Sequence, residues 1–200
     1  MRERKQQKIF SGVTVRRQSI NQLLLVLVFS IAGVRQGVAA GSVAEELQKQ
    51  WDFVRNTVLA MAAAIPEDKY DYRPTPEVRS FREQLTHIVD ETLMYTSLAA
   101  GKKPDRNFAQ TLKRKDEIRK ALATAYGNGD KLLSGFTDQQ LLELVPGRTG
   151  EEQTRMSLLV FNLLDNMDHY GNLVVYMRVN GLVPPRTADR PPRTVNRPPR

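Results

Sequence analysis

The sequence predicts an all-α protein, a four-helix bundle built from residues 41–185. In four segments, apolar residues recur every three or four positions, which is typical of amphipathic helices. Prolines and glycines separate these segments, as expected for helix ends. No segment combines two-residue alternation, β-branched residues and a hairpin turn, so no sheet is expected. The chain has 40% apolar residues and no cysteine, which indicates a globular protein and excludes disulfides, thiolate metal sites and a cysteine nucleophile.

The first helix is expected over Val43–Ala64. Pro66 ends it, because proline lacks an amide donor and clashes with the preceding turn. Residues 66–79 contain three prolines and several charged residues, so this segment is expected to be a loop. One apolar stripe follows the helix: Leu47, Trp51, Val54, Val58 and Met61.

The second helix is expected to begin after Ser80 and to run to about Ala100. Ser80 and Glu83 have the spacing of a capping box, in which each side chain binds the other residue's amide. Gly101 is a typical helix stop. Residues 101–111 are numerous enough for a crossover connection to the next helix.

The third helix is expected over roughly Leu112–Ser134, loosened by Gly127 and Gly129, since glycine is a weak helix former. The fourth is expected over roughly Glu151–Asn180, with Gly181 just beyond its end. Four helices within about 145 residues then complete the bundle.

The net charge of +8 belongs to the two ends of the chain. Residues 1–40 carry seven basic residues and one acidic residue, and residues 186–200 carry five and one. The remaining 41–185 hold 18 basic and 20 acidic residues, a net charge of −2. The basic composition therefore does not predict a polyanion partner for the bundle, and no helix has the basic stripe of a nucleic-acid-binding surface.

Residues 1–40 are predicted to be a signal peptide for export to the periplasm or the exterior. A basic stretch precedes the apolar run Leu23–Val34, which is too short to span a bilayer. Val38 and Ala40 provide the small residues of a cleavage site after Ala40. Arg35 lies between the run and this site, and leaves open an uncleaved anchor or a basic leader.

Residues 186–200 are predicted to be a disordered tail rich in arginine and proline. The segment from residue 184 reads PPRTADRPPRTVNRPPR, a seven-residue repeat whose paired prolines favour an extended chain. The tail could make weak contact with an anionic membrane surface, or it is simply a solvated extension.

Polar residues on two helices form a candidate metal site. Asp165 and His169 are four residues apart, so both project from one side of the fourth helix. His87 of the second helix could supply a third ligand. Two imidazoles and a carboxylate suit zinc, nickel, manganese or iron. The alternative is a hydrogen-bonded core histidine beside an Asp165–His169 ion pair.

Several segments resemble the DinB-like (damage-inducible) four-helix-bundle superfamily. The similarity spans roughly residues 44–185 and implies that fold. Its segments are 69–81 (KYDYRPTPEVRSF), 85–88 (LTHI), 169–178 (HYGNLVVYMR) and 180–185 (NGLVPP).

The resemblance also implies a metal site with one histidine from the second helix and two histidines four apart in the fourth. His87 matches the first and His169 the last, whereas Asp165 stands where the family has the middle histidine. An aspartate can bind a divalent metal, so this departure implies either an oxygen-richer site or a degenerate one.

Known members of the family imply a metal-dependent enzyme, a thiol S-transferase or a hydrolase, acting on a small molecule. Glu91 lies one turn after His87 and would act as a base or orient that imidazole, unless it is a solvated glutamate. The competing hypothesis is a non-catalytic exported bundle, tethered by its basic tail. A homodimer fits either hypothesis, and neither involves nucleic acid.

Overall fold

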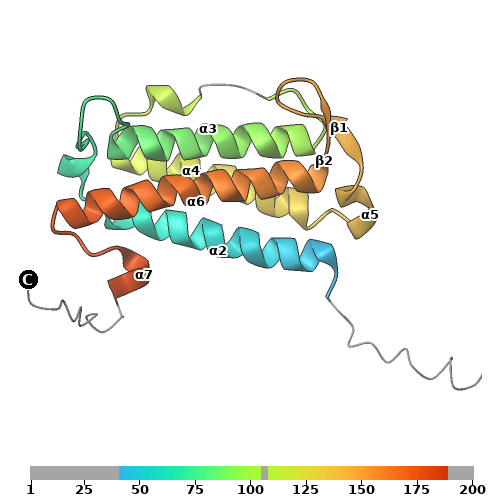
Figure 1. Cartoon of the computed structure of the whole chain (residues 1–200), viewed down its shortest axis with the longest axis horizontal. Helices are drawn as coiled ribbons and strands as arrows, with labels where there is room; N and C mark the ends of the chain where they lie inside the picture. The colour runs from blue at the N-terminus through green and yellow to red at the C-terminus, as the bar shows by residue number, and fades with distance from the viewer. Residues whose placement is uncertain (1–40, 105–107, 189–200) are drawn as a thin grey trace, which may run out of the picture. The chain divides into compact units, whose positions relative to one another are not determined.

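The computed structural model describes residues 41–104 and 108–188, and four long helices dominate it (Figure 1). The all-α class and the four-helix bundle are thereby confirmed. The predicted signal peptide and residues 189–200 of the predicted tail lie outside the described residues. The long helices are α2 (Val43–Ala64), α3 (Phe81–Ala99), α4 (Lys115–Leu133) and α6 (Arg155–Val179). The short elements are η1 (Glu67–Lys69), η2 (Ala109–Thr111), α5 (Asp138–Leu141), β1 (Leu144–Pro146), β2 (Glu152–Thr154) and α7 (Pro185–Ala188).

The helices form a bundle in which α3 packs against α4 and α6, and α2 packs against the same two. Helix α4 begins beside the end of α2. The Lys115 ammonium in its first turn donates to the carbonyl oxygen of Ala63 at 2.8 Å. Helix α6 begins where α3 ends, where the Arg155 guanidinium donates to the carbonyl of Ala99. Helices α3 and α4 are therefore parallel, and the connection between them returns along the bundle as the predicted crossover (Figure 1).

The helix starts follow their local capping chemistry. The predicted capping box of α3 is present, with Ser80 Oγ accepting from the Glu83 amide at 3.2 Å and Glu83 Oε2 from the Ser80 amide at 2.7 Å. Helix α4 starts three residues later than predicted. There the Glu117 carboxylate accepts from the amides of Lys113 and Arg114, which holds both residues outside the helix.

The core between α2 and α4 is closely packed around Trp51. Its ring meets that of Tyr126 edge-on at a centroid distance of 5.5 Å, and it is fully buried. A Cβ atom at Gly129 would lie 1.9 Å from Trp51 Cζ2. Helix α4 is continuous through Gly127 and Gly129, as predicted, and Gly129 makes room for the indole.

A β-hairpin replaces the predicted start of the fourth helix. Strands β1 and β2 pair antiparallel, with Val145 opposite Gln153, and α6 begins only at Arg155. The tip of the hairpin contains Gly150 at φ 99°, a backbone conformation that favours glycine. The expectation of no sheet is therefore wrong at this one place, because strands of three residues are too short to show an alternating pattern.

The chain after α6 also differs from the prediction of an extended tail. Helix α7 covers Pro185–Ala188, since proline is well suited to a first helical position. The Arg186 guanidinium lies 4.5 Å from the centre of the Phe53 ring of α2. Within 41–104 and 108–188, no helix has the length and apolar character needed to cross a membrane.

Candidate metal centre

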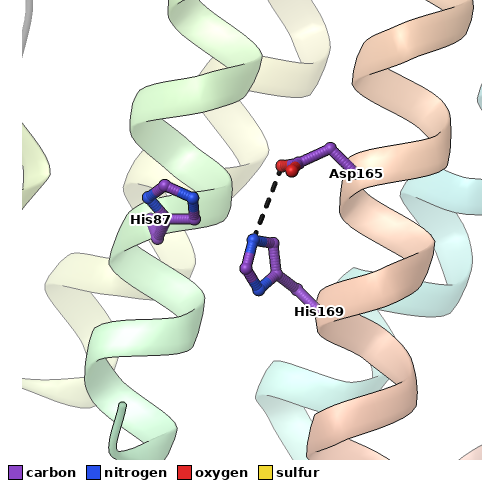
Figure 2. A group of neighbouring side chains, drawn as sticks. All are labelled: His87, Asp165 and His169. Carbon is purple, nitrogen blue, oxygen red and sulfur yellow. Dashed lines mark ion pairs between the residues drawn. The ribbon is translucent and has the colours of Figure 1, made fainter. Parts of the chain in front are cut away.

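Three side chains of α3 and α6 meet in the bundle, and Figure 2 shows Asp165 and His169 projecting from α6 toward α3, which carries His87. One ligand atom each from His87, Asp165 and His169 lies within 4.8 Å of the others. Asp165 Oδ2 is 3.6 Å from His169 Nε2, and the two imidazole rings are 4.6 Å apart between centroids. The four-residue spacing on α6 and the packing of α3 against α6 produce this convergence.

The orientation of His169 is set by Gln84, one turn before His87 on α3. Gln84 Oε1 accepts a hydrogen bond from His169 Nδ1 at 2.6 Å. Both side chains are buried, and the Gln84 amide donates in turn to the Tyr176 hydroxyl at 3.5 Å. A carbonyl oxygen can only accept, so the proton of the neutral imidazole is on Nδ1 and the Nε2 lone pair faces the centre.

Two acceptor atoms consequently face each other in the centre. The Nε2 lone pair faces Asp165 Oδ2, which is buried and has no hydrogen-bond partner. Buried polar atoms are normally paired, because an unpaired one costs about 1–3 kcal/mol. A cation between these atoms would satisfy them together, so the residues fit a divalent metal. Two nitrogens and one oxygen suit zinc, nickel, manganese or ferrous iron.

Burial keeps both imidazoles in the neutral form that binds metals. It lowers the pKa of His87 to about 4, and the charge of Arg79 contributes in the same direction. The pKa of His169 is also lowered, first by burial and then by Arg79. Protons therefore compete weakly for these ligands at neutral pH.

Burial acts in the opposite direction on the carboxylates. It raises the pKa of Asp165, while the nearby His87 lowers it. It also raises the pKa of Glu91, and the charge of Asp165 raises it further. Glu91 therefore lies close enough to Asp165 for their charges to interact. It is not one of the three residues whose ligand atoms converge.

The structure adds two arginines that the sequence did not single out. Arg79 precedes α3, and Arg148 lies at the tip of the hairpin. The charges of both lower the pKa values of His87 and Asp165, so both guanidinium groups lie near the centre. The position of Arg148 depends on the hairpin, which the sequence did not predict. Arg79 could have been singled out, because it lies one residue before the Ser80 cap of α3.

A sequence model of the DinB superfamily matches residues 50–173. Among solved structures, a DinB-like protein from Bacillus cereus is similar with a TM-score of 0.64, 17% identity, and coverage of 72% of this chain and 96% of that one. A DinB-like protein from Bacillus subtilis has a TM-score of 0.56 at 23% identity, covering 68% and 92%. A conserved protein from Enterococcus faecalis has a TM-score of 0.58 at 17% identity, covering 70% and 98%. No curated protein matches the sequence.

Proposed function

The chain belongs to the DinB superfamily, and from this premise we propose that it binds a divalent metal and uses it in a reaction on a small molecule, of the thiol S-transferase or hydrolase type. The single observation that carries the proposal is the group His87, Asp165 and His169, whose ligand atoms lie within 4.8 Å of one another and include the buried, unpaired Asp165 Oδ2. Aspartate in place of the family's middle histidine leaves a complete set of three ligands.

Each residue of the centre has a distinct part in this proposal. His87, Asp165 and His169 would hold the metal, and Gln84 keeps the proton of His169 on Nδ1. The bound metal would supply a Lewis acid that favours the thiolate form of a substrate thiol or polarises a carbonyl. Glu91 would accept the substrate proton, because its raised pKa makes it a stronger base than an ordinary glutamate.

Metal content tests the binding step. The untagged full chain is purified, and its metals are measured by mass spectrometry beside His87→Ala and Asp165→His. We expect about one metal per chain in the wild type, retention in Asp165→His, and loss in His87→Ala. Absence of metal from the wild type, without uptake of added zinc, nickel or manganese, would overturn the proposal.

Conjugation of a small thiol to an alkyl halide tests the reaction. In this step the thiol proton passes to Glu91, the sulfur bonds to carbon, and the halide leaves. We expect Glu91→Gln to slow the metal-loaded protein about a hundredfold, because a lost general base typically costs 10²–10⁴ in rate. An unchanged rate would remove Glu91 from the mechanism, and no rate above the metal-free control would reject transferase activity.

We also propose that the chain is exported and that its tail contacts anionic surfaces. The support is the sequence of residues 1–40 and the five arginines of 186–200. Fractionation of a producing cell, with mass analysis of the new N-terminus, tests export and cleavage after Ala40.

For the tail, deletion of 189–200 should reduce binding to anionic vesicles at low salt, and unchanged binding would reject the contact.

A further inference from the structure

A polar cleft of about 470 Å³ opens beside His87. It lies between the segment that precedes α3, the first turns of α3, and the segment that precedes α4. One ligand of the metal centre therefore lines a space large enough for a small molecule. Its charged lining residues are four basic and three acidic side chains: Arg73, Arg79, Arg82, Lys113, Glu77, Glu83 and Asp90.

Two of the four basic side chains are already paired. Arg73 forms an ion pair with Glu83 at 3.0 Å. Arg82 forms one with Asp71. These contacts hold the loop before α3 against the start of that helix, so both cations are structural.

The acidic side chains of the cleft are also occupied. Asp90 Oδ1 accepts a hydrogen bond from the Ala109 amide at 2.8 Å, which fixes η2 against α3. A hydrogen bond from the Thr75 side chain lowers the pKa of Glu77. Neither carboxylate forms an ion pair with another described residue.

Arg79 and Lys113 are the two cations of the cleft that form no ion pair. Within the described parts of the chain, neither side chain has a hydrogen-bond or ion-pair partner. They approach the cleft from different segments, one before α3 and one before α4. Arg79 also lies close enough to the centre for its charge to act on both histidines. The two unpaired cations line the same cleft as His87 and offer an anion two positive partners there.

We propose that this cleft binds an oxyanion, the carboxylate or phosphate group of a small substrate, through Arg79 and Lys113. The guanidinium can hold both oxygens of such a group, and the ammonium adds a second charge. The inference deepens the proposed function, since an anion held here would place the rest of the substrate beside His87. It defines the substrate class as small anions.

Calorimetric titration of the full chain as purified, with succinate and separately with inorganic phosphate, tests this inference. The variants are Arg79→Gln and Lys113→Gln, with Lys120→Gln as a charge-matched control on the exposed side of α4. We expect at least one probe to bind, about tenfold more weakly in each cleft variant and equally in the control. The preferred probe identifies the anion as a carboxylate or a phosphate.

Binding by neither probe, or equal binding by Arg79→Gln and the control, overturns the inference. Thermal unfolding checks that each variant folds. The His87→Ala variant separates the two proposals: anion binding that survives there and still depends on Arg79 supports the cleft even if no metal is bound. If the protein binds metal but its anion binding does not depend on Arg79, the anion proposal is rejected and the metal proposal stands.

Discussion

The hydrogen bond between Gln84 and His169 decides whether the centre can accept a cation. It fixes the Nδ1 proton and so directs the Nε2 lone pair toward Asp165. We expect Gln84→Leu to weaken metal binding about 10–100-fold, the usual cost of losing such a partner, whereas Gln84→Glu should restore binding because a carboxylate also accepts from Nδ1. Competition with a chelating dye measures both affinities. Equal affinity in the leucine variant would show that His169 is oriented by packing alone.

His87 should make the metal-free protein less stable in acid. Its pKa is about 4 in the fold and about 6.5 when unfolded, so the unfolded chain binds more protons between these values. The free energy of unfolding should therefore fall as the pH drops from 6.5 to 4, by about 2 kcal/mol for a partly exposed ring. His169 acts in the same direction and the raised pKa of Asp165 in the opposite one.

Denaturant titrations of wild type and His87→Gln in chelator isolate this contribution. The difference in unfolding free energy between the two should change with pH across this window and be constant above pH 7. A constant difference throughout would mean that the imidazole is as easily protonated in the fold as in the unfolded chain.

At this scale the sequence predicted which three side chains converge but not their surroundings. The spacing of Asp165 and His169 needs only helix geometry, and both the bundle fold and the family resemblance indicated His87 as the third residue. Gln84 shares the face of His87 in any helical projection, yet its role depends on which side chain α6 places opposite. Arg148 could not be predicted, because its position depends on a hairpin with three-residue strands.

At the scale of elements, the contact between α2 and α4 depends on one glycine. A Cβ at Gly129 would overlap the Trp51 ring, whereas at Gly127 it would meet nothing within 4 Å. We expect Gly129→Ala to destabilise the fold by about 2 kcal/mol through overpacking. Gly127→Ala should stabilise it by about 0.5–1 kcal/mol, since alanine is the better helix former. Thermal unfolding of both variants compares them directly.

If both alanine variants had the same stability, the close approach of Trp51 to α4 would be contradicted. The sequence indicated two glycines in a helix and could not distinguish them. Both are unfavourable by helix propensity, and only the position of the indole on another helix gives one of them a packing role. Helix ends were easier to predict, because caps such as Ser80 and Glu83 act within one turn.

At the scale of the molecule, the order of the helices brings together the three residues of the candidate metal centre from parts of the chain that are far apart in sequence. The crossover makes α3 parallel to α4, and α6 returns antiparallel to α3, so His87 faces residues about 80 positions later. Any cation bound there links α3 to α6, and the unfolded chain has no such site. Metal binding should therefore stabilise the whole bundle rather than one helix.

Thermal unfolding with and without metal measures this linkage. At a free metal concentration 100 times the Kd, stabilisation should be about 2.7 kcal/mol, which corresponds to a rise in Tm of about 5–10 °C for a domain of this size. Asp165→Ala should abolish the rise, while Asp168→Ala, an exposed neighbour on the same helix, should keep it. If the two variants responded equally to metal, the ion would be bound elsewhere. A rise that is lost in Asp165→Ala alone would require the metal to bind the folded chain through that carboxylate.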